Sequence, residues 1–325
     1  IVGIFLSCEK KDNEKDNLVL KNRINYGLIT VDNGILCFEN PEHVQQTMNI
    51  LEEQLNQYQQ SLEPLFEGLS DDELVELAEN TTIVFEQPLL DFEALYNYNS
   101  LRKVLSEAEE EWLSHTEGED INEDPDNHFI LDDIFRVLLN EYVEIKIGNT
   151  YYKGTEEGWL EIPASNIVGL LRLRTTDSLS LNAGNQNQPM AGDCSSMKIK
   201  WGYQANGQRR IKWVIGHVTF PTSIGRYVIA KTKNYYKNNR NRWRKYATYC
   251  YVKAYGHISG QDGNCETQFD FNPNNNYVLK PTARKVRHKI LVSTKTKSGW
   301  VKGYHKGISS TSHAGIVYNS TLDWY

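Results

Sequence analysis

The stretch from Arg226 to Lys253 concentrates side chains that could bind an anion. It carries nine Lys and Arg residues and no acid, and tyrosines and a tryptophan lie among the cations. Positive charge beside flat aromatic faces is the combination with which proteins bind single-stranded nucleic acids. Sulfated and uronic-acid glycans can use the same combination. The candidate ligand-binding residues are Lys231, Lys233, Tyr235, Lys237, Arg240, Arg242, Trp243, Arg244 and Lys245.

The same residues have a purely structural interpretation. Tyrosines fill the cores of many β proteins, and lysines at sheet edges keep neighbouring sheets from pairing. The sequence leaves both interpretations open.

Patterns for catalysis and for metal binding are weak. The chain has no G-x-S-x-G, HExxH or P-loop pattern and no CxxC pair. A glycosidase needs two facing carboxylates, and residues 194–325 offer Asp262 and Glu266 in a Gly- and Asn-rich loop. We therefore predict no catalytic residue, no metal and no cofactor. The alternative is a hydrolase that acts on surface polysaccharide or peptide from a site in the C-terminal β domain.

The run from Glu107 to Asp126 contains ten acids and no Lys or Arg. It lacks the glycine and the terminal glutamate of an EF-hand loop. We therefore expect a solvated loop there instead of a calcium site.

Charge divides the chain into two halves of opposite sign. Residues 1–193 contain 12 Lys and Arg against 38 Asp and Glu, for a net charge of -26. Residues 194–325 contain 23 against 4, for a net charge of +19. Such asymmetry points to an anionic partner for the basic half. An intramolecular contact between the acidic and the basic domain explains it equally well.

The cationic stretch reads as two strands around a polar turn. Side chains alternate with period two in a strand, so the odd-numbered residues from Tyr227 to Tyr235 share one face. Residues 236–241 are rich in turn formers.

Residues 285–292 alternate bases with mostly apolar residues, and we expect their cationic face to be solvated. The strands expected in this half, typical of a sandwich or barrel, are 197–203, 210–220, 226–236, 242–255, 267–271, 285–296 and 316–324.

The acidic half reads as short hairpins and amphipathic helices. Asn33-Gly34 between β-rich runs predicts a hairpin within residues 24–39. Asn40 and Pro41 begin a helix with an apolar seam, which is either core or a dimerising coiled coil, and core is favoured. The seam residues are Val44, Met48, Leu51, Leu55, Tyr58 and Leu62. Further helices are expected over residues 71–77, 101–112 and 129–139, and a strand–turn–strand unit over 142–162.

The first residues resemble the end of a secretory signal. An apolar run leads into Leu6-Ser7-Cys8, which is typical of a bacterial lipobox whose cysteine thiol is lipidated. The charged residues 9–23 suit a flexible tether. The alternative is a buried strand with an ordinary cysteine. We predict lipidation at Cys8 and attachment to a membrane through that lipid anchor.

Three segments resemble a family of uncharacterised Bacteroidetes surface lipoproteins. They are FLSC at 5–8, VDNGILCFENPEHV at 31–44 and EIKIGNTYYKGTEEGWLEI at 144–162, within a resemblance that covers residues 1–165. The resemblance implies a small α+β N-terminal domain followed by a β domain. It also implies an outer-membrane lipoprotein that faces the cell surface or the periplasm, and it assigns no binding residues.

These patterns predict an α+β protein with an acidic helix-and-hairpin N-terminal domain and a basic, all-β, sandwich-like C-terminal domain. The expected segments are a signal remnant with lipobox (1–8), a tether (9–23), the acidic domain (24–174), a Ser-, Asn- and Gly-rich linker (175–196) and the basic domain (197–325).

An oxidising compartment would permit one disulfide among Cys37, Cys194, Cys250 and Cys265. The predicted function is binding or adhesion to an anionic glycan, such as a polysaccharide, or another envelope polymer. Nucleic acid is the less expected partner outside the cell.

Overall fold

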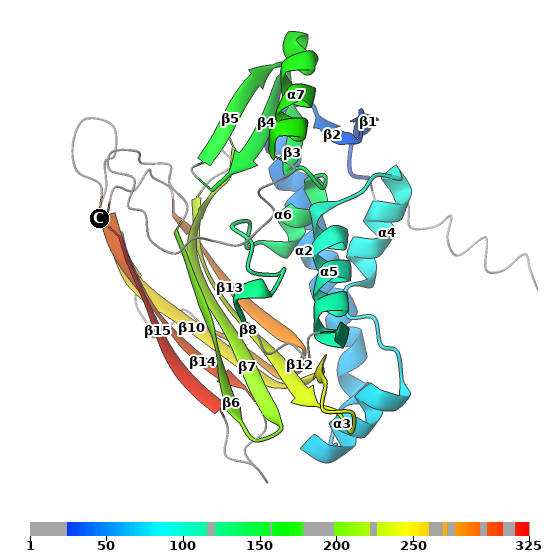
Figure 1. Ribbon diagram of the computed structural model, residues 1–325, viewed down its shortest axis with the longest axis vertical. Helices are drawn as coiled ribbons and strands as arrows, with labels where there is room; N and C mark the ends of the chain where they lie inside the picture. The colour runs from blue at the N-terminus through cyan, green and yellow to red at the C-terminus, as the bar shows by residue number, and fades with distance from the viewer. Residues whose placement is uncertain are drawn as a thin grey trace, which may run out of the picture.

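In the computed structural model, the strands of the basic half form two sheets packed face to face, and helices cover one of them (Figure 1). The structure describes residues 25–115, 121–156, 158–177, 198–221, 226–259, 269–271, 277–292, 298–307 and 316–324. Cys8, the expected tether and residues 178–196 of the expected linker lie outside these ranges. Within them, no helix combines the length and apolar character needed to span a bilayer.

The acidic half contains one small sheet. Its strands, in spatial order, are β1 (Thr30–Asp32), β2 (Ile35–Phe38), β3 (Glu144–Ile147), β4 (Thr150–Thr155) and β5 (Gly158–Pro163). The expected Asn-Gly hairpin is confirmed, because Asn33 and Gly34 adopt φ of 52° and 76°. Both central residues of a type I′ turn need a positive φ. The second expected hairpin is confirmed in β3 and β4.

The helices of the acidic half are α2 (Pro41–Leu62), α3 (Asp71–Asn80), α4 (Gln87–Tyr96), α5 (Leu101–His115), α6 (Asp133–Leu138) and α7 (Ile167–Asp177), with 3₁₀ turns at Glu63–Leu65, Ile121–Glu123 and Ala164–Asn166. α2 begins where the sequence predicts, since the Asn40 side chain accepts a hydrogen bond of 2.8 Å from the His43 amide. Val44, Met48 and Leu51 of its seam are fully buried, so the seam is part of the core.

Three helices differ from expectation. α6 is shorter than residues 129–139 because the Asp132 side chain caps it, accepting from the amides of Ile134 and Phe135. α4 was not expected. α7 was not expected either, and it makes residues 175–177 of the predicted linker helical.

The basic half is a β-sandwich of antiparallel strands. One sheet has the order β13 (Lys285–Val292), β8 (Arg226–Lys237), β7 (Arg209–Thr219), β6 (Lys198–Asn206), with β9 (Trp243–Lys245) beside β8. The other has the order β11 (Phe269–Phe271), β10 (Thr248–Ser259), β14 (Ser298–Gly307), β15 (Ile316–Trp324), with β12 (Tyr277–Ala283) beside β10. The predicted α+β class with a β-rich C-terminal half is confirmed, whereas β12 and β14 were not expected.

The first sheet separates two cores. Even-numbered residues of β8, such as Val228 and Ala230, pack against the second sheet. Tyr227 and Ile229 belong instead to the core of the helices, where the tilted rings of Phe220 and Phe135 of α6 lie 4.3 Å apart between centroids. The odd face of β8, predicted from alternation, is therefore the face that the helices cover.

Candidate functional site

A row of lysines crosses the helix-covered sheet face. Lys285 of β13 lies opposite Lys233 of β8, and Lys233 lies opposite Lys212 of β7. Like charges directly opposite one another destabilise a sheet. The positive charge of this row therefore has to be balanced by negative groups from outside the sheet.

Carboxylates of the acidic half provide this compensation. Glu109 of α5 pairs with Lys233 at 3.2 Å and with Lys245 of β9 at 3.1 Å. Asp126 lies 2.7 Å from Lys233 and 3.1 Å from Lys212. We call the following set the ionic layer: Glu109, Asp124, Asp126 and Asp133 with Lys212, Lys231, Lys233, Lys245 and Lys285.

The ionic layer corrects the expectation for the acidic run. Glu109, Asp124 and Asp126 were predicted to belong to a solvated loop, but they are 3%, 3% and 5% exposed. Glu109 lies on α5, whose apolar face packs on the sheet through Trp112 and Leu113. The acids are buried because α5 places Glu109 over the lysine row, and the residues after the 3₁₀ turn Ile121–Glu123 place Asp124 and Asp126 there.

The predicted solvated face of β13 is wrong for the same reason. The side chains of Lys285, Arg287 and Lys289 are only 20%, 13% and 13% exposed. Arg287 and Lys289 both pair with Glu52 and with Asp132, and Lys285 pairs with Glu86 and Asp133.

Nearby lysines keep the carboxylates of Glu109, Asp126 and Asp133 ionised. Burial by itself raises the pKa of Glu109, but Lys233 and Lys245 outweigh it and hold this pKa far below its ordinary value. The same opposition leaves the pKa of Asp126 and of Asp133 well below the ordinary range. Burial lowers the pKa of Lys231 to about 8, although Asp133 opposes the shift.

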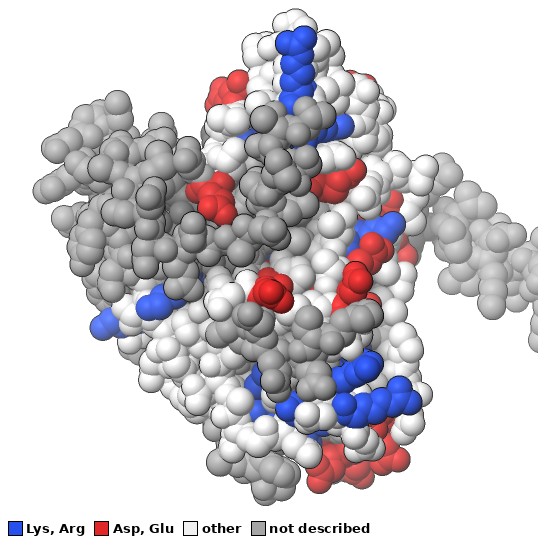
Figure 2. All heavy atoms as spheres, viewed as in Figure 1, with Lys and Arg blue, Asp and Glu red and all other residues white. Residues whose placement is uncertain are grey.

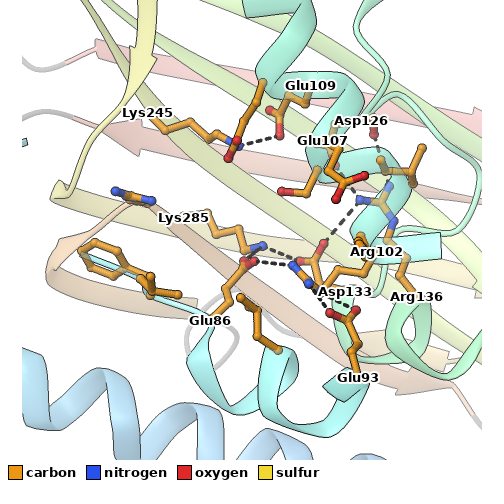
Figure 3. A pocket seen from close by; sticks show the side chains of 18 of the residues that line it. Glu86, Glu93, Arg102, Glu107, Glu109, Asp126, Asp133, Arg136, Lys245 and Lys285 are labelled. Atoms are coloured by element: carbon orange, nitrogen blue, oxygen red, sulfur yellow. Dashed lines mark hydrogen bonds and ion pairs between the residues drawn. The ribbon is translucent and has the colours of Figure 1, made fainter. Parts of the chain in front are cut away.

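The layer opens into a cavity of about 670 Å³ between the sheet and the helices. Residues 82–86, α4 and α5 form one side, and the edges of β8, β9 and β13 form the other. Figure 3 shows Lys245 reaching Glu109, and Arg102 and Lys285 both pointing to Glu86. Arg102 also donates from Nε to Glu93 at 2.8 Å.

Five of the nine candidate binding residues belong to the interior. Lys231, Lys233, Tyr235 and Trp243 are buried, and Lys245 is largely covered by its pairing with Glu109. Tyr235 donates a hydrogen bond of 2.9 Å to Glu109. Expecting these side chains on an exposed binding surface was wrong, because the acidic helices cover that face of the sheet.

The other four candidates lie at the end of the β8–β9 hairpin. Arg240 is exposed, and Lys237, Arg242 and Arg244 are half-buried. The turn is held by Asn238, whose side-chain oxygen accepts from the amides of Arg240 and Arg242 at 3.0 and 2.9 Å. Lys and Arg side chains gather at this end of the molecule (Figure 2).

A hydrogen-bonded network of His305, Ser320 and Thr232 lies inside the β-sandwich. The ring nitrogens of His305 lie 2.8 Å from Ser320 Oγ and 3.0 Å from Thr232 Oγ1. All three residues are buried between the sheets, and burial lowers the pKa of His305 to about 3. A substrate cannot reach this network, so we assign it to packing.

Asp262, Glu266, Cys194 and Cys265 lie outside the described residues. Cys37 and Cys250, within them, have free thiols. Across the described ranges, no group of three or more His, Cys, Asp or Glu side chains is arranged to hold a metal.

No family model matches the chain, and no curated protein matches it. The crystal structure of a DUF4848 family protein from Bacteroides thetaiotaomicron aligns with 91% of this chain and 100% of its own, at 10% identity. The TM-score of 0.23 is too low to establish a common fold.

Proposed function

We propose that the protein is a binding module which holds an anionic glycan, or another anionic envelope polymer, at the end of the β8–β9 hairpin. One observation carries the proposal. Three cations of the Arg226–Lys253 stretch that face the helices, Lys231, Lys233 and Lys245, each pair with a carboxylate. In the part of the chain that the structure describes, Arg240, Arg242 and Arg244 have none within ion-pair distance.

Three arginines within five residues repel one another unless an anion offsets them. Exposed ion pairs are each worth only about 0–1 kcal/mol, so folding gives little reason to gather them. Several simultaneous contacts with a polyanion add together and depend strongly on salt. Arginine also donates two parallel hydrogen bonds to a carboxylate or sulfate group.

Retention of the full-length protein on heparin resin tests this site. The variant Arg240→Glu, Arg242→Glu, Arg244→Glu should elute at much lower salt than the parent, with a nearly unchanged melting temperature. The control is Lys103→Glu, Arg172→Glu, Lys200→Glu, which changes net charge equally at scattered exposed positions. Equal elution of the two variants would mean that net charge, and not the hairpin, governs binding.

We also propose that the protein is exported and lipid-anchored through Cys8, which the Leu6-Ser7-Cys8 pattern supports. Expression of the chain behind a full signal sequence in a diderm bacterium should place it in the membrane fraction. Cys8→Ser should release it. If both forms fractionate alike and remain unprocessed, the anchor is refuted.

A further inference from the structure

The cavity beside the ionic layer has the construction of a small-molecule site. Its volume of about 670 Å³ falls within the range of roughly 300–1,000 Å³ typical of ligand pockets. Phe85, Leu90 and Leu105 contribute apolar surface, and the sheet contributes cations. Sites of this kind combine an apolar wall with a few polar groups that fix orientation.

Most charges that line the cavity already have a partner. Lys233 and Lys245 pair with Glu109, and Arg136 pairs with Asp126. Arg102 pairs with Glu86 and Glu93. These ion pairs hold the wall in place, and they leave few charged groups free to bind a ligand.

Arg284 differs from the other buried and half-buried cations of the wall. Among the described residues it has no carboxylate within ion-pair distance, and its buried Nε has no hydrogen-bond partner. A buried donor without a partner is costly, whereas a ligand oxygen could accept a hydrogen bond from the Arg284 Nε. Arg284 is therefore the cation of this wall with which a ligand anion would pair.

The guanidinium of Arg284 is also held in a defined orientation. Its central carbon lies 4.7 Å from the centroid of the Phe85 ring. Stacking on an aromatic face leaves the guanidinium edge able to donate to a carboxylate. An apolar surface thus lies directly beside the anion-binding edge.

The mouth of the cavity selects against long polyanions. Glu63, Glu107 and Glu110 line the cavity and are exposed to solvent. Their negative charges would repel a polymer that carries many acidic groups. A ligand with one anionic group avoids most of this repulsion.

We propose that this cavity binds a small organic monoanion, whose carboxylate or sulfonate pairs with Arg284 and whose aromatic or branched aliphatic body packs on Phe85, Leu90 and Leu105. The site is separate from the arginines of the β8–β9 hairpin. It does not depend on polymer binding there.

Calorimetric titration of the full chain with three probes tests the proposal: 2-naphthoate, indole-3-acetate and 4-methylvalerate. We expect at least one probe to bind with 1:1 stoichiometry, and the neutral alcohol of the same skeleton to bind more weakly. Arg284→Gln should weaken the anion by about tenfold or more, the usual worth of a charge-assisted hydrogen bond. Arg242→Gln, which removes a hairpin arginine, should change the affinity by less than about twofold.

Two further variants keep the outcome decisive. Ala94→Trp places a large ring at an exposed position that lines the cavity, and it should abolish binding while the melting temperature stays near that of the parent. The triple hairpin variant should bind the probe normally, even if it no longer binds heparin. The proposal is overturned if no probe binds below about 1 mM, or if Arg284→Gln binds as the parent does.

Discussion

Glu109 of α5 connects the helices to the sheet through three polar groups. Its carboxylate accepts from Lys233, Lys245 and the Tyr235 hydroxyl, and each of these groups comes from the β-sandwich. Because Glu109 is only 3% exposed, water cannot replace it. Breaking a buried ion pair by removing one partner leaves the other charge uncompensated and typically costs about 3–5 kcal/mol.

We therefore expect Glu109→Gln to lower the free energy of unfolding by about 3–5 kcal/mol. The next residue gives a matched control, because the Glu110 side chain is 71% exposed and 4.0 Å from Lys245. Glu110→Gln should change stability by less than about 0.5 kcal/mol. Urea unfolding measures both. Similar losses in the two variants would show that net charge, and not the buried pairing, is responsible.

His305 predicts how stability responds to acid. Burial lowers its pKa to about 3 from an ordinary value of 6.5, so the folded protein holds this ring neutral. The unfolded chain takes up the proton as the pH falls through about 6.5, which means that stability is present above that pH and is lost below it. Between these two pKa values, His305 should lower the free energy of unfolding by close to about 1.4 kcal/mol for each unit by which the pH falls.

Urea midpoints between pH 7.5 and 4.5 check this slope. His305→Gln removes one titrating group and should reduce the slope in that range, even if it lowers stability throughout. Part of the slope should remain, because burial also lowers the pKa of His128 to about 3. Below about pH 4.5 the curve should steepen in both proteins, because the lowered pKa of Asp126, Asp132 and Asp133 adds proton uptake on unfolding there. An unchanged slope above pH 4.5 in His305→Gln would contradict the assignment.

At the scale of elements, local patterns predicted most of the strands and helices. The Asn-Gly hairpin, the Asn40 cap and the alternation of β8 are short-range signals, and each is confirmed. α4 and β14 were missed, since neither has a strong boundary signal together with a clear period. α6 is shorter than the helix predicted over residues 129–139. Asp132, which caps its N-terminus, lies within the apolar run on which that prediction was based.

The exposure of strand faces was predicted less well. Lysines on β8 and β13 suggested a solvated surface, yet Lys231 and Lys233 share their face with Tyr227 and Ile229, which are buried. A face that mixes apolar residues with lysines can be buried only if acids arrive from elsewhere in the chain. Those acids are distant in sequence, as Lys233 and Glu109 are 124 positions apart. The cavity, which needs both halves, could not be predicted for the same reason.

At the scale of the whole molecule, the charge asymmetry has a structural counterpart. The halves of net charge -26 and +19 meet along the ionic layer, and they also share an apolar core that includes Phe135 and Phe220. Two explanations of their association make different predictions. General attraction between opposite net charges is screened by salt, whereas buried pairs and apolar packing are screened much less.

Cutting the chain between the halves separates these explanations. A specific protease site placed at residues 184–190, within the expected linker, would yield an acidic and a basic fragment. We expect the fragments to co-elute in gel filtration even at about 1 M salt, where the screening length is only about 3 Å, and to separate in urea. The same cut made in the Glu109→Gln protein should need less urea for separation. If the fragments of the parent part at high salt without urea, long-range attraction holds the halves together, and the ionic layer contributes little to their association.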